Sequence, residues 1–216
     1  MKEAPLSKEE KLALEHERLA GLWQYEHEYP QYSLICGIDE VGRGPLAGPV
    51  YAGAVILPKD IELLYLNDSK KLTEKRREKL SAEIRECAIA WGIGSTDAER
   101  IDEIGIVPAT FEAMAKAVAA MAVQPDILFV DAFHIKTLEQ YPQVPIIKGD
   151  QKSASIAAAS IIAKVERDHL MMELDEKYPG YGFSSNKGYG SKAHLEALVR
   201  QGPCEIHRRS FIHNYT

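Results

Sequence analysis

The chain has 216 residues, which suffices for one well-buried domain with terminal additions and is short for two independent cores. Its 45% hydrophobic and 27% charged residues are ordinary for a globular protein, and no apolar run approaches the roughly 18 residues that a membrane span needs. The first 28 residues are charged and lack the apolar segment of a secretory signal, so we expect a cytoplasmic protein without membrane contact.

The formal net charge of −6 argues against a protein that wraps nucleic acid indiscriminately. The charge is unevenly distributed, however: residues 70–85 carry seven Lys or Arg against three Glu, and residues 184–216 carry five against two. Three widely spaced cysteines without a C-x-x-C pair indicate reduced thiols rather than a zinc or redox site.

Residues 1–33 are predicted to form a helical N-terminal extension, because apolar residues recur at roughly helical spacing from Leu6 to about Glu28 and Tyr29-Pro30 then ends the pattern. Whether it packs on the core is left open. Residues 34–216 form the expected main domain. In its first half we predict strands at 34–38 and 50–57, a helix from the N-cap Thr73 to 86, and a strand at 89–93.

In the second half, a helix is expected from Pro108 to about 121, followed by a continuously apolar strand at 127–131 and a short strand at 144–147. A long helix at 153–177 and a short one at 192–200 follow, with the C-terminal helical region beginning near 180. Strands that first cluster and then alternate with helices predict an α/β fold, with a mixed sheet and helices on both of its faces.

Acidic residues stand at three of these strand ends: Asp39 and Glu40, then Asp131, then Asp150. Carboxylates gathered at one edge of a sheet repel one another, and a bound divalent cation relieves that repulsion. Oxygen ligands suit Mg²⁺ or Mn²⁺, and two such ions can hydrolyse a phosphodiester. Strand-terminal acids also commonly only cap turns, so spacing alone leaves a metal site and a structural role both open.

The pair Asp39 and Glu40 raises a geometric difficulty, because adjacent residues on a regular strand point to opposite faces of the sheet. We therefore expect the strand to break at Glu40, where Gly42 to Pro45 would permit it. If Glu40 instead lies on an undisturbed strand facing away from Asp39, this segment should not supply two carboxylates to one site.

The segment Gly42-Arg43-Gly44-Pro45-Leu46-Ala47 matches the dinucleotide-binding pattern G-x-G-x-x-G/A. That pattern must open a helix, whereas here Gly48 and Pro49 lead into a predicted strand, so the match is accidental. The glycines are better interpreted as letting the backbone approach a ligand closely, with Arg43 available to contact a phosphate or sugar.

The chain resembles type 2 ribonuclease H, the ribonuclease HII family, over nearly its whole length from about Ile35. The resemblance rests on five segments in order: Gly37 to Pro49, Asp68-Ser69-Lys70-Lys71-Leu72, Ser155 to Asp168, Asn186 to Gly190 with His194, and His207 to Phe211. The related type 3 enzymes share the Asp-Glu pair but lack the glycine-arginine-glycine loop, which favours type 2.

This resemblance implies a bacterial ribonuclease H-like enzyme that hydrolyses the RNA strand of RNA–DNA hybrids. It also implies cutting on the 5′ side of ribonucleotides embedded in duplex DNA, which leaves 5′-phosphate and 3′-hydroxyl ends, as in ribonucleotide excision repair and DNA replication. Four residues match the family's catalytic and metal-binding carboxylates, with two Mg²⁺ or Mn²⁺ ions when substrate is bound. These are Asp39, Glu40, Asp131 and Asp150.

The same resemblance assigns substrate contacts. The glycine-arginine-glycine loop matches the segment that reads the ribose 2′-hydroxyl, and Tyr189 matches a tyrosine that stacks on the deoxyribose after the ribonucleotide. The expected substrate-binding residues are Gly42, Arg43, Gly44, Tyr189, Lys70, Lys71 and Lys187.

Three residues of the long predicted helix, Lys164, Arg167 and Asp168, are interpreted as structural ion pairs. Two other functions are weighed: a catalytically silent nucleic-acid-binding module of the same fold, and a phosphatase acting on small metabolites. The presence of all four carboxylates disfavours the first, and the basic segments with Tyr189 disfavour the second. We expect a monomer, and the sequence indicates no protein partner.

Overall fold

A single five-stranded sheet organises the computed structural model, which describes residues 6–215. The strand order is β3-β2-β1-β4-β5, and its two halves run differently. β1 pairs antiparallel with β2, and β2 with β3, whereas β4 runs parallel to both β1 and β5. The strands are β1 Ile35–Val41, β2 Val50–Ile56, β3 Ala90–Thr96, β4 Ile127–Asp131 and β5 Gln143–Ile146.

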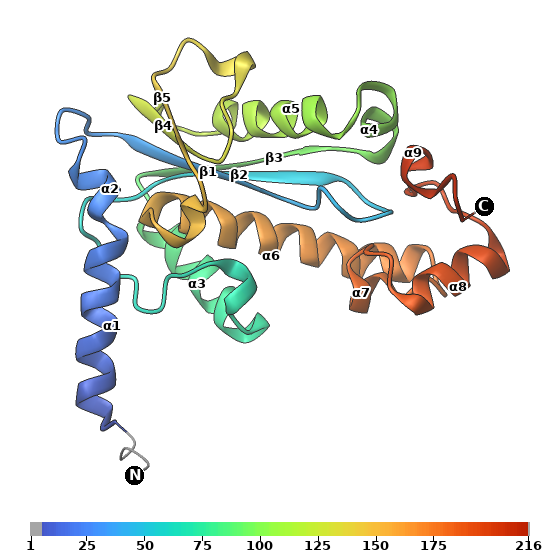
Figure 1. Ribbon diagram of the computed structural model, residues 1–216, viewed down its shortest axis with the longest axis horizontal. Coiled ribbons are helices and arrows are strands. Elements are labelled where there is room, and N and C mark those ends of the chain that lie inside the picture. The colour runs from blue at the N-terminus through green and yellow to red at the C-terminus, as the bar shows by residue number, and fades with distance from the viewer. Residues whose placement is uncertain (1–5, 216) are drawn as a thin grey trace.

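Helices lie on both faces of this sheet, with α5 along one face and α6 along the other (Figure 1). Glycines permit this close packing. A Cβ on Gly94 would lie 2.1 Å from the Ala113 carbonyl oxygen of α5, and one on Gly53 would lie 2.4 Å from the Ala159 carbonyl oxygen of α6. The predicted mixed α/β sandwich is therefore confirmed. Its helices are α1 Lys8–Leu22, α2 Gln24–His27, α3 Glu74–Cys87, α4 Ala98–Ile104, α5 Ile106–Ala119, α6 Ala154–Lys177, α7 Phe183–Asn186, α8 Lys192–Gln201 and α9 Arg209–Ile212.

The N-terminal segment forms two helices rather than the single one expected, and residues 1–5 of the predicted extension lie outside the described part. The beginning of α1 projects away from the body of the protein (Figure 1), while the leucines of its last turn are buried. Leu19, Leu22 and Trp23 belong to the same apolar cluster as Leu80 of α3 and Ala158 of α6. The sequence left open whether the N-terminal extension packs on the core. The C-terminal end of α1 does.

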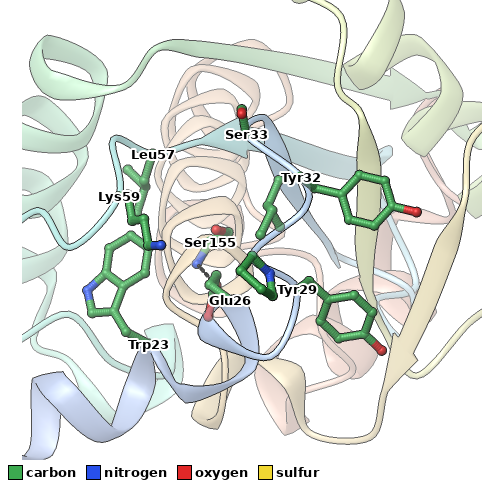
Figure 2. Close-up of a pocket in the computed structure, with 10 residues that line it drawn as sticks. Trp23, Glu26, Tyr29, Tyr32, Ser33, Leu57, Lys59 and Ser155 are labelled. Atoms are coloured by element: carbon green, nitrogen blue, oxygen red, sulfur yellow. Dashed lines mark hydrogen bonds between the residues drawn. The ribbon is translucent and has the colours of Figure 1, made fainter.

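A buried carboxylate joins the N-terminal segment to the start of α6 (Figure 2). Glu26 Oε1 accepts hydrogen bonds from Ser153 Oγ at 2.6 Å and from the Ser155 amide at 3.0 Å. Ser153 is itself the N-cap of the 24-residue helix, accepting from the Ile156 amide. An anionic acceptor at a helix N-terminus satisfies free N–H groups and complements the helix dipole, so Glu26 fixes where α6 begins.

Most predicted elements occur within a few residues of their expected bounds, and the Thr73, Ser153 and Ser191 caps all accept a backbone amide hydrogen bond. The exception is α4, which the sequence did not indicate. It is capped by Asp97, whose side chain accepts from the Arg100 amide at 2.8 Å. Seven residues carry too little periodicity to predict a helix, and this one is held by local capping and tertiary packing.

Among residues 6–215, no helix has both the length and the apolar character needed to cross a membrane.

Candidate active site

Asp39 and Glu40 lie inside β1, which continues to Val41, so the strand break expected at Glu40 is absent. The antiparallel register with β2 runs without interruption through Asp39↔Gly53 and Glu40↔Ala52. The expectation was wrong because Gly42 allows the chain to turn after the strand, not within it. By strand alternation the two side chains leave β1 on opposite faces. We stated above that this arrangement would count against Asp39 and Glu40 both serving one site.

The parallel pairing of β1 with β4 nevertheless brings a third carboxylate to the same end of the sheet. Asp131 is the last residue of β4, and its Oδ1 accepts the Gly149 amide at 2.7 Å. That bond holds the one-turn 3₁₀ helix Gly149–Gln151, which contains Asp150, against the end of β4. The sheet topology therefore gathers all three acidic segments at one edge.

The pKa shifts of Asp39 and Glu40 indicate that the charges of these carboxylates act on one another. Burial raises the pKa of Asp39 well above its usual range, and the charges of Glu40 and Asp131 raise it further, against a hydrogen bond from Ser160. Burial also raises the pKa of Glu40, with Arg43 opposing the shift and Asp131 adding to it. The charge of Asp131 thus acts on both Asp39 and Glu40, although these two side chains leave β1 on opposite faces.

Asp150 and Lys70 complete this charged group. Burial raises the pKa of Asp150 to about 6, and the carboxylates of Asp68 and Asp131 contribute to the shift. Burial lowers the pKa of Lys70, but Asp39, Asp150 and Asp68 outweigh it, so the net shift is upward. The Lys70 ammonium is therefore the nearby cation that these carboxylates stabilise.

The donor set fits a hard divalent cation in its chemistry. All four predicted ligands offer oxygen, and Glu40 Oε2 is buried without a hydrogen-bond partner. Glu40 Oε1 faces Arg43 Nη1 at 3.5 Å. Within residues 6–215, however, no three His, Cys, Asp or Glu side chains are arranged to hold a metal ion. The carboxylates share one region without forming a complete ligand shell.

A cleft of about 410 Å³ opens beside this cluster. One wall is the glycine-arginine-glycine loop with Tyr189, where the ring comes within 3.7 Å of the place that a Gly44 Cβ would occupy. The other wall comes from Lys70 and its neighbour Ser69 together with α6. The lining residues are Glu40, Val41, Gly42, Arg43, Gly44, Ser69, Lys70, Ser160, Lys164 and Tyr189.

The three lysines predicted to bind substrate are placed differently. Lys70 lines the cleft. Lys71 is exposed, and Lys187 donates its ammonium to the Ser184 carbonyl of its own loop at 2.5 Å; neither is among the residues lining the cleft. Their substrate contacts stay predictions.

Five further residues belong to this region although none was predicted as a site residue from the sequence. Asp68 caps the turn before Lys70 by accepting its amide at 2.9 Å, and Gln151 donates to Asp68 at 3.4 Å. Ser69 and Ser160 share a 2.9 Å hydrogen bond. Lys164 forms the predicted ion pair with Asp168 at 2.6 Å and also lines the cleft. The four-residue spacing of Ser160 and Lys164 places both on one face of α6, which was the available signal.

The sheet order and the acidic edge beside a basic, glycine-walled cleft define a nuclease of ribonuclease H-like fold. Residues 36–214 match the family model described as ribonuclease HII. The ribonuclease HII of Lachnoclostridium phytofermentans is 61% identical over 207 residues, which is 96% of this chain and 81% of that protein. That of Acetivibrio thermocellus is 52% identical over 97% of this chain and 84% of its own length. The chain belongs to the ribonuclease HII family.

Solved structures support the same fold. The ribonuclease H2 of Pyrococcus horikoshii OT3 superposes with a TM-score of 0.69 at 29% identity, over 82% of this chain and 92% of that one. The ribonuclease HII in a complex with PCNA from Archaeoglobus fulgidus gives 0.70, also at 29% identity, over 82% and 93%. The predicted ribonuclease H assignment is therefore confirmed: the chain is a hydrolase of the RNA–DNA hybrid endonuclease class.

Proposed function

We propose that this enzyme cuts on the 5′ side of ribonucleotides embedded in duplex DNA, as well as within RNA–DNA hybrids, leaving 5′-phosphate and 3′-hydroxyl ends. One observation carries the proposal: the cleft that Glu40 lines at the acidic edge of the sheet has the glycine-arginine-glycine loop and Tyr189 as one of its walls. A phosphodiester placed against the acids would have its adjoining sugar against that loop.

In this proposal Asp39, Glu40, Asp131 and Asp150 hold Mg²⁺ or Mn²⁺, two ions when substrate is bound. The proposal retains Glu40, although it leaves β1 on the face opposite Asp39, because the Asp131 carboxylate raises the pKa of both residues. Magnesium in particular is usually held by one or two carboxylates together with water and substrate phosphate, so a complete protein shell is not required. When bound, such ions supply an activated water and stabilise the leaving oxygen. The protein's own part is to bring four carboxylates, of which Asp39 and Asp150 are buried, to one edge of the sheet and to keep Lys70 beside them.

The loop wall is proposed to distinguish RNA from DNA. Backbone groups of Gly42 to Gly44 would bond the ribose 2′-hydroxyl, the group by which a protein recognises RNA. Tyr189, which is 45% exposed, would stack on the deoxyribose that follows. Lys71 and Lys187 would contact phosphates farther along the duplex.

The proposal is tested with a labelled DNA duplex that contains one ribonucleotide, incubated with Mg²⁺, with Mn²⁺, or with EDTA. We expect one cut at the 5′ side of the ribonucleotide with either metal and none in EDTA. Matched all-DNA and RNA–DNA duplexes serve as controls. Cleavage in EDTA would exclude the metal assignment, and binding without cleavage under every metal condition would favour the catalytically silent module.

The same proposal includes residues 34–216 as the catalytic domain, residues 1–33 as an extension, a monomeric state and a cytoplasmic location. Nothing in the chain identifies a protein partner.

A further inference from the structure

Two arginines lie fully buried beneath the loop wall of the cleft. Arg167 of α6 and Arg208, which precedes α9, are both 0% exposed and are among the largest fully buried side chains of the described residues. Neither forms an ion pair with an Asp or Glu within residues 6–215. A buried guanidinium without a carboxylate must find other acceptors, because leaving its donors unpaired is costly.

Arg208 bonds three carbonyls of the glycine-arginine-glycine loop and its continuation. Its Nη2 donates to the Gly42 carbonyl at 2.6 Å, its Nη1 to that of Arg43 at 2.9 Å, and its Nε to that of Gly48 at 2.9 Å. All three acceptors are backbone groups outside the strand ladders. The guanidinium therefore replaces the hydrogen bonds that secondary structure would otherwise provide.

Arg167 joins that loop to the one carrying Tyr189. Its Nε donates to the Pro49 carbonyl at 3.0 Å and its Nη2 to the Ala47 carbonyl at 3.2 Å. Its Nη1 donates to the Lys187 carbonyl at 2.9 Å, two residues before Tyr189. One rigid side chain thus spans two segments about 140 residues apart in the chain.

Glycines make this contact possible. Gly42 has a φ of +90°, and a Cβ there would lie 2.2 Å from Arg167 Nε. Gly188 has a φ of +85°, and a Cβ there would lie 2.4 Å from the Ala47 carbonyl oxygen. A direct backbone bond, from the Leu46 amide to the Gly188 carbonyl at 2.8 Å, closes the same joint. These glycines are therefore needed for packing within the protein, whatever they do for a ligand.

We propose that Arg167 and Arg208 are positioning residues that lock the glycine-arginine-glycine loop and the Tyr189 loop into one ribose-reading unit. The inference rests on the proposed function of these loops. It assigns the shape of the glycine-arginine-glycine loop to Arg208 and the spacing between the two loops to Arg167. A lysine could not replace either arginine, because one ammonium cannot reproduce a planar fork that reaches three carbonyls. Burial and the neighbouring Arg167 lower the pKa of Arg208 to about 9, which leaves it charged near neutral pH.

The test compares Arg167→Lys, Arg208→Lys and, as a matched control, Arg200→Lys. Arg200 also donates to a backbone carbonyl, that of Gly180 at 3.2 Å, but it is exposed and its acceptor lies outside both loops. The parent enzyme must first cut the single-ribonucleotide duplex in Mg²⁺ or Mn²⁺; if it does not, the proposed function fails before this inference is reached. For each variant, kcat and KM are measured on that duplex and on a long RNA–DNA hybrid, and amide hydrogen exchange is measured without substrate or metal.

We expect either buried-site variant to lower kcat/KM on the single ribonucleotide about ten-fold more than on the long hybrid, equivalent to about 1.4 kcal/mol. Faster exchange should be confined to residues 42–49 and 187–190, with no such change in Arg200→Lys. An equal loss on both substrates, or exchange unchanged in these two segments, would overturn the inference. If one variant does not fold, the other decides; if neither folds, Gly188→Ala loosens the same joint, and an equal loss on both substrates there counts against the inference.

Discussion

The acidic edge beside the cleft and the loop wall of the cleft are built on opposite electrostatic principles. At the acidic edge, Asp39, Glu40 and Asp150 are held where burial and mutual repulsion raise their pKa values, and Glu40 Oε2 has no partner. We define the loop junction as residues 42–49 and 187–190 together with Arg167 and Arg208. In this junction each of the two guanidiniums donates hydrogen bonds to three backbone carbonyls.

This difference indicates what each region needs in order to work. At the acidic edge, the burial and mutual repulsion of the carboxylates are unfavourable, and a bound cation would relieve them. Functional sites often keep such unfavourable arrangements at the expense of stability. The loop junction is complete within the protein and needs nothing added. Changes at the edge should therefore remove chemistry without lowering stability, whereas changes at the junction should loosen the structure and alter selectivity.

The largest effect is expected from Asp39→Asn, which removes one of the four proposed metal ligands. Cleavage of the embedded ribonucleotide should fall by at least about 10³-fold, equivalent to roughly 4 kcal/mol of transition-state stabilisation. Duplex binding should be largely retained. In EDTA the Tm should be unchanged or higher, because a buried like charge has been removed. Retained cleavage would refute the ligand assignment, and a fall of many degrees in Tm would contradict the contrast between the two regions.

A smaller effect is expected from Tyr189→Ala, on the loop wall of the cleft. Loss of the stacking ring should reduce cutting at a single ribonucleotide about ten-fold, within the 1–3 kcal/mol of a stacking contact, with less effect on a long hybrid. Tyr189→Phe serves as the control, since it keeps the ring. Steady-state kinetics on the two substrates measure the ratio, and equal losses on both would show that Tyr189 does not sense the junction between RNA and DNA.

The next smaller effect is expected from Glu26→Ala. This variant tests whether the N-terminal segment stabilises the acidic edge. Removing this acceptor leaves the Ser153 hydroxyl and the Ser155 amide unsatisfied beside the segment that contains Asp150, at a cost of about 1–3 kcal/mol. Glu26→Gln retains an acceptor oxygen and should be milder. Urea unfolding measures both, with the exposed Glu28→Ala as a control; equal stability of the alanine variant and the parent enzyme would show that this contact is dispensable.

The smallest effect is a pH dependence arising beside the loop junction. His194 Nδ1 bonds the Tyr189 carbonyl at 2.8 Å, and its Nε2 lies 3.0 Å from His207 Nε2. Burial, with a contribution from His194, lowers the pKa of His207 to about 4. The unfolded chain therefore binds a proton near its ordinary pKa, about 6.5, before the folded protein does.

The stability from neutral His207 is thus fully present above about pH 6.5 and is lost as the pH falls toward 4. The pKa values of the buried carboxylates are raised, so these groups change the stability with pH in the opposite sense. The contribution of His207 is therefore measured as the difference in Tm between the parent enzyme and His207→Phe across this pH window. That difference should narrow by a few degrees as the solution is acidified. A constant difference from pH 7.5 to 4.5 would contradict the lowered pKa of His207.

The sequence was sufficient for much of the fold. Apolar runs located all five strands, and the Thr73 cap was correctly predicted. It was insufficient where an element depends on its neighbours: α4 is short, and the N-terminal helix is interrupted at Trp23, a residue that packs into the core. The strand break at Glu40 was predicted from local glycines, yet pairing with β2 keeps β1 regular through that residue.

By itself, then, the sequence determined the family and named the acids and the glycine-arginine-glycine loop, because these motifs lie in contiguous stretches of chain. Only the tertiary structure decided what lies beneath them. Arg167 was interpreted as an ion-pairing helix residue, but it bonds three backbone carbonyls from two distant loops. A side chain's hydrogen-bond partners depend on which segments the sheet brings together, and no local spacing encodes them.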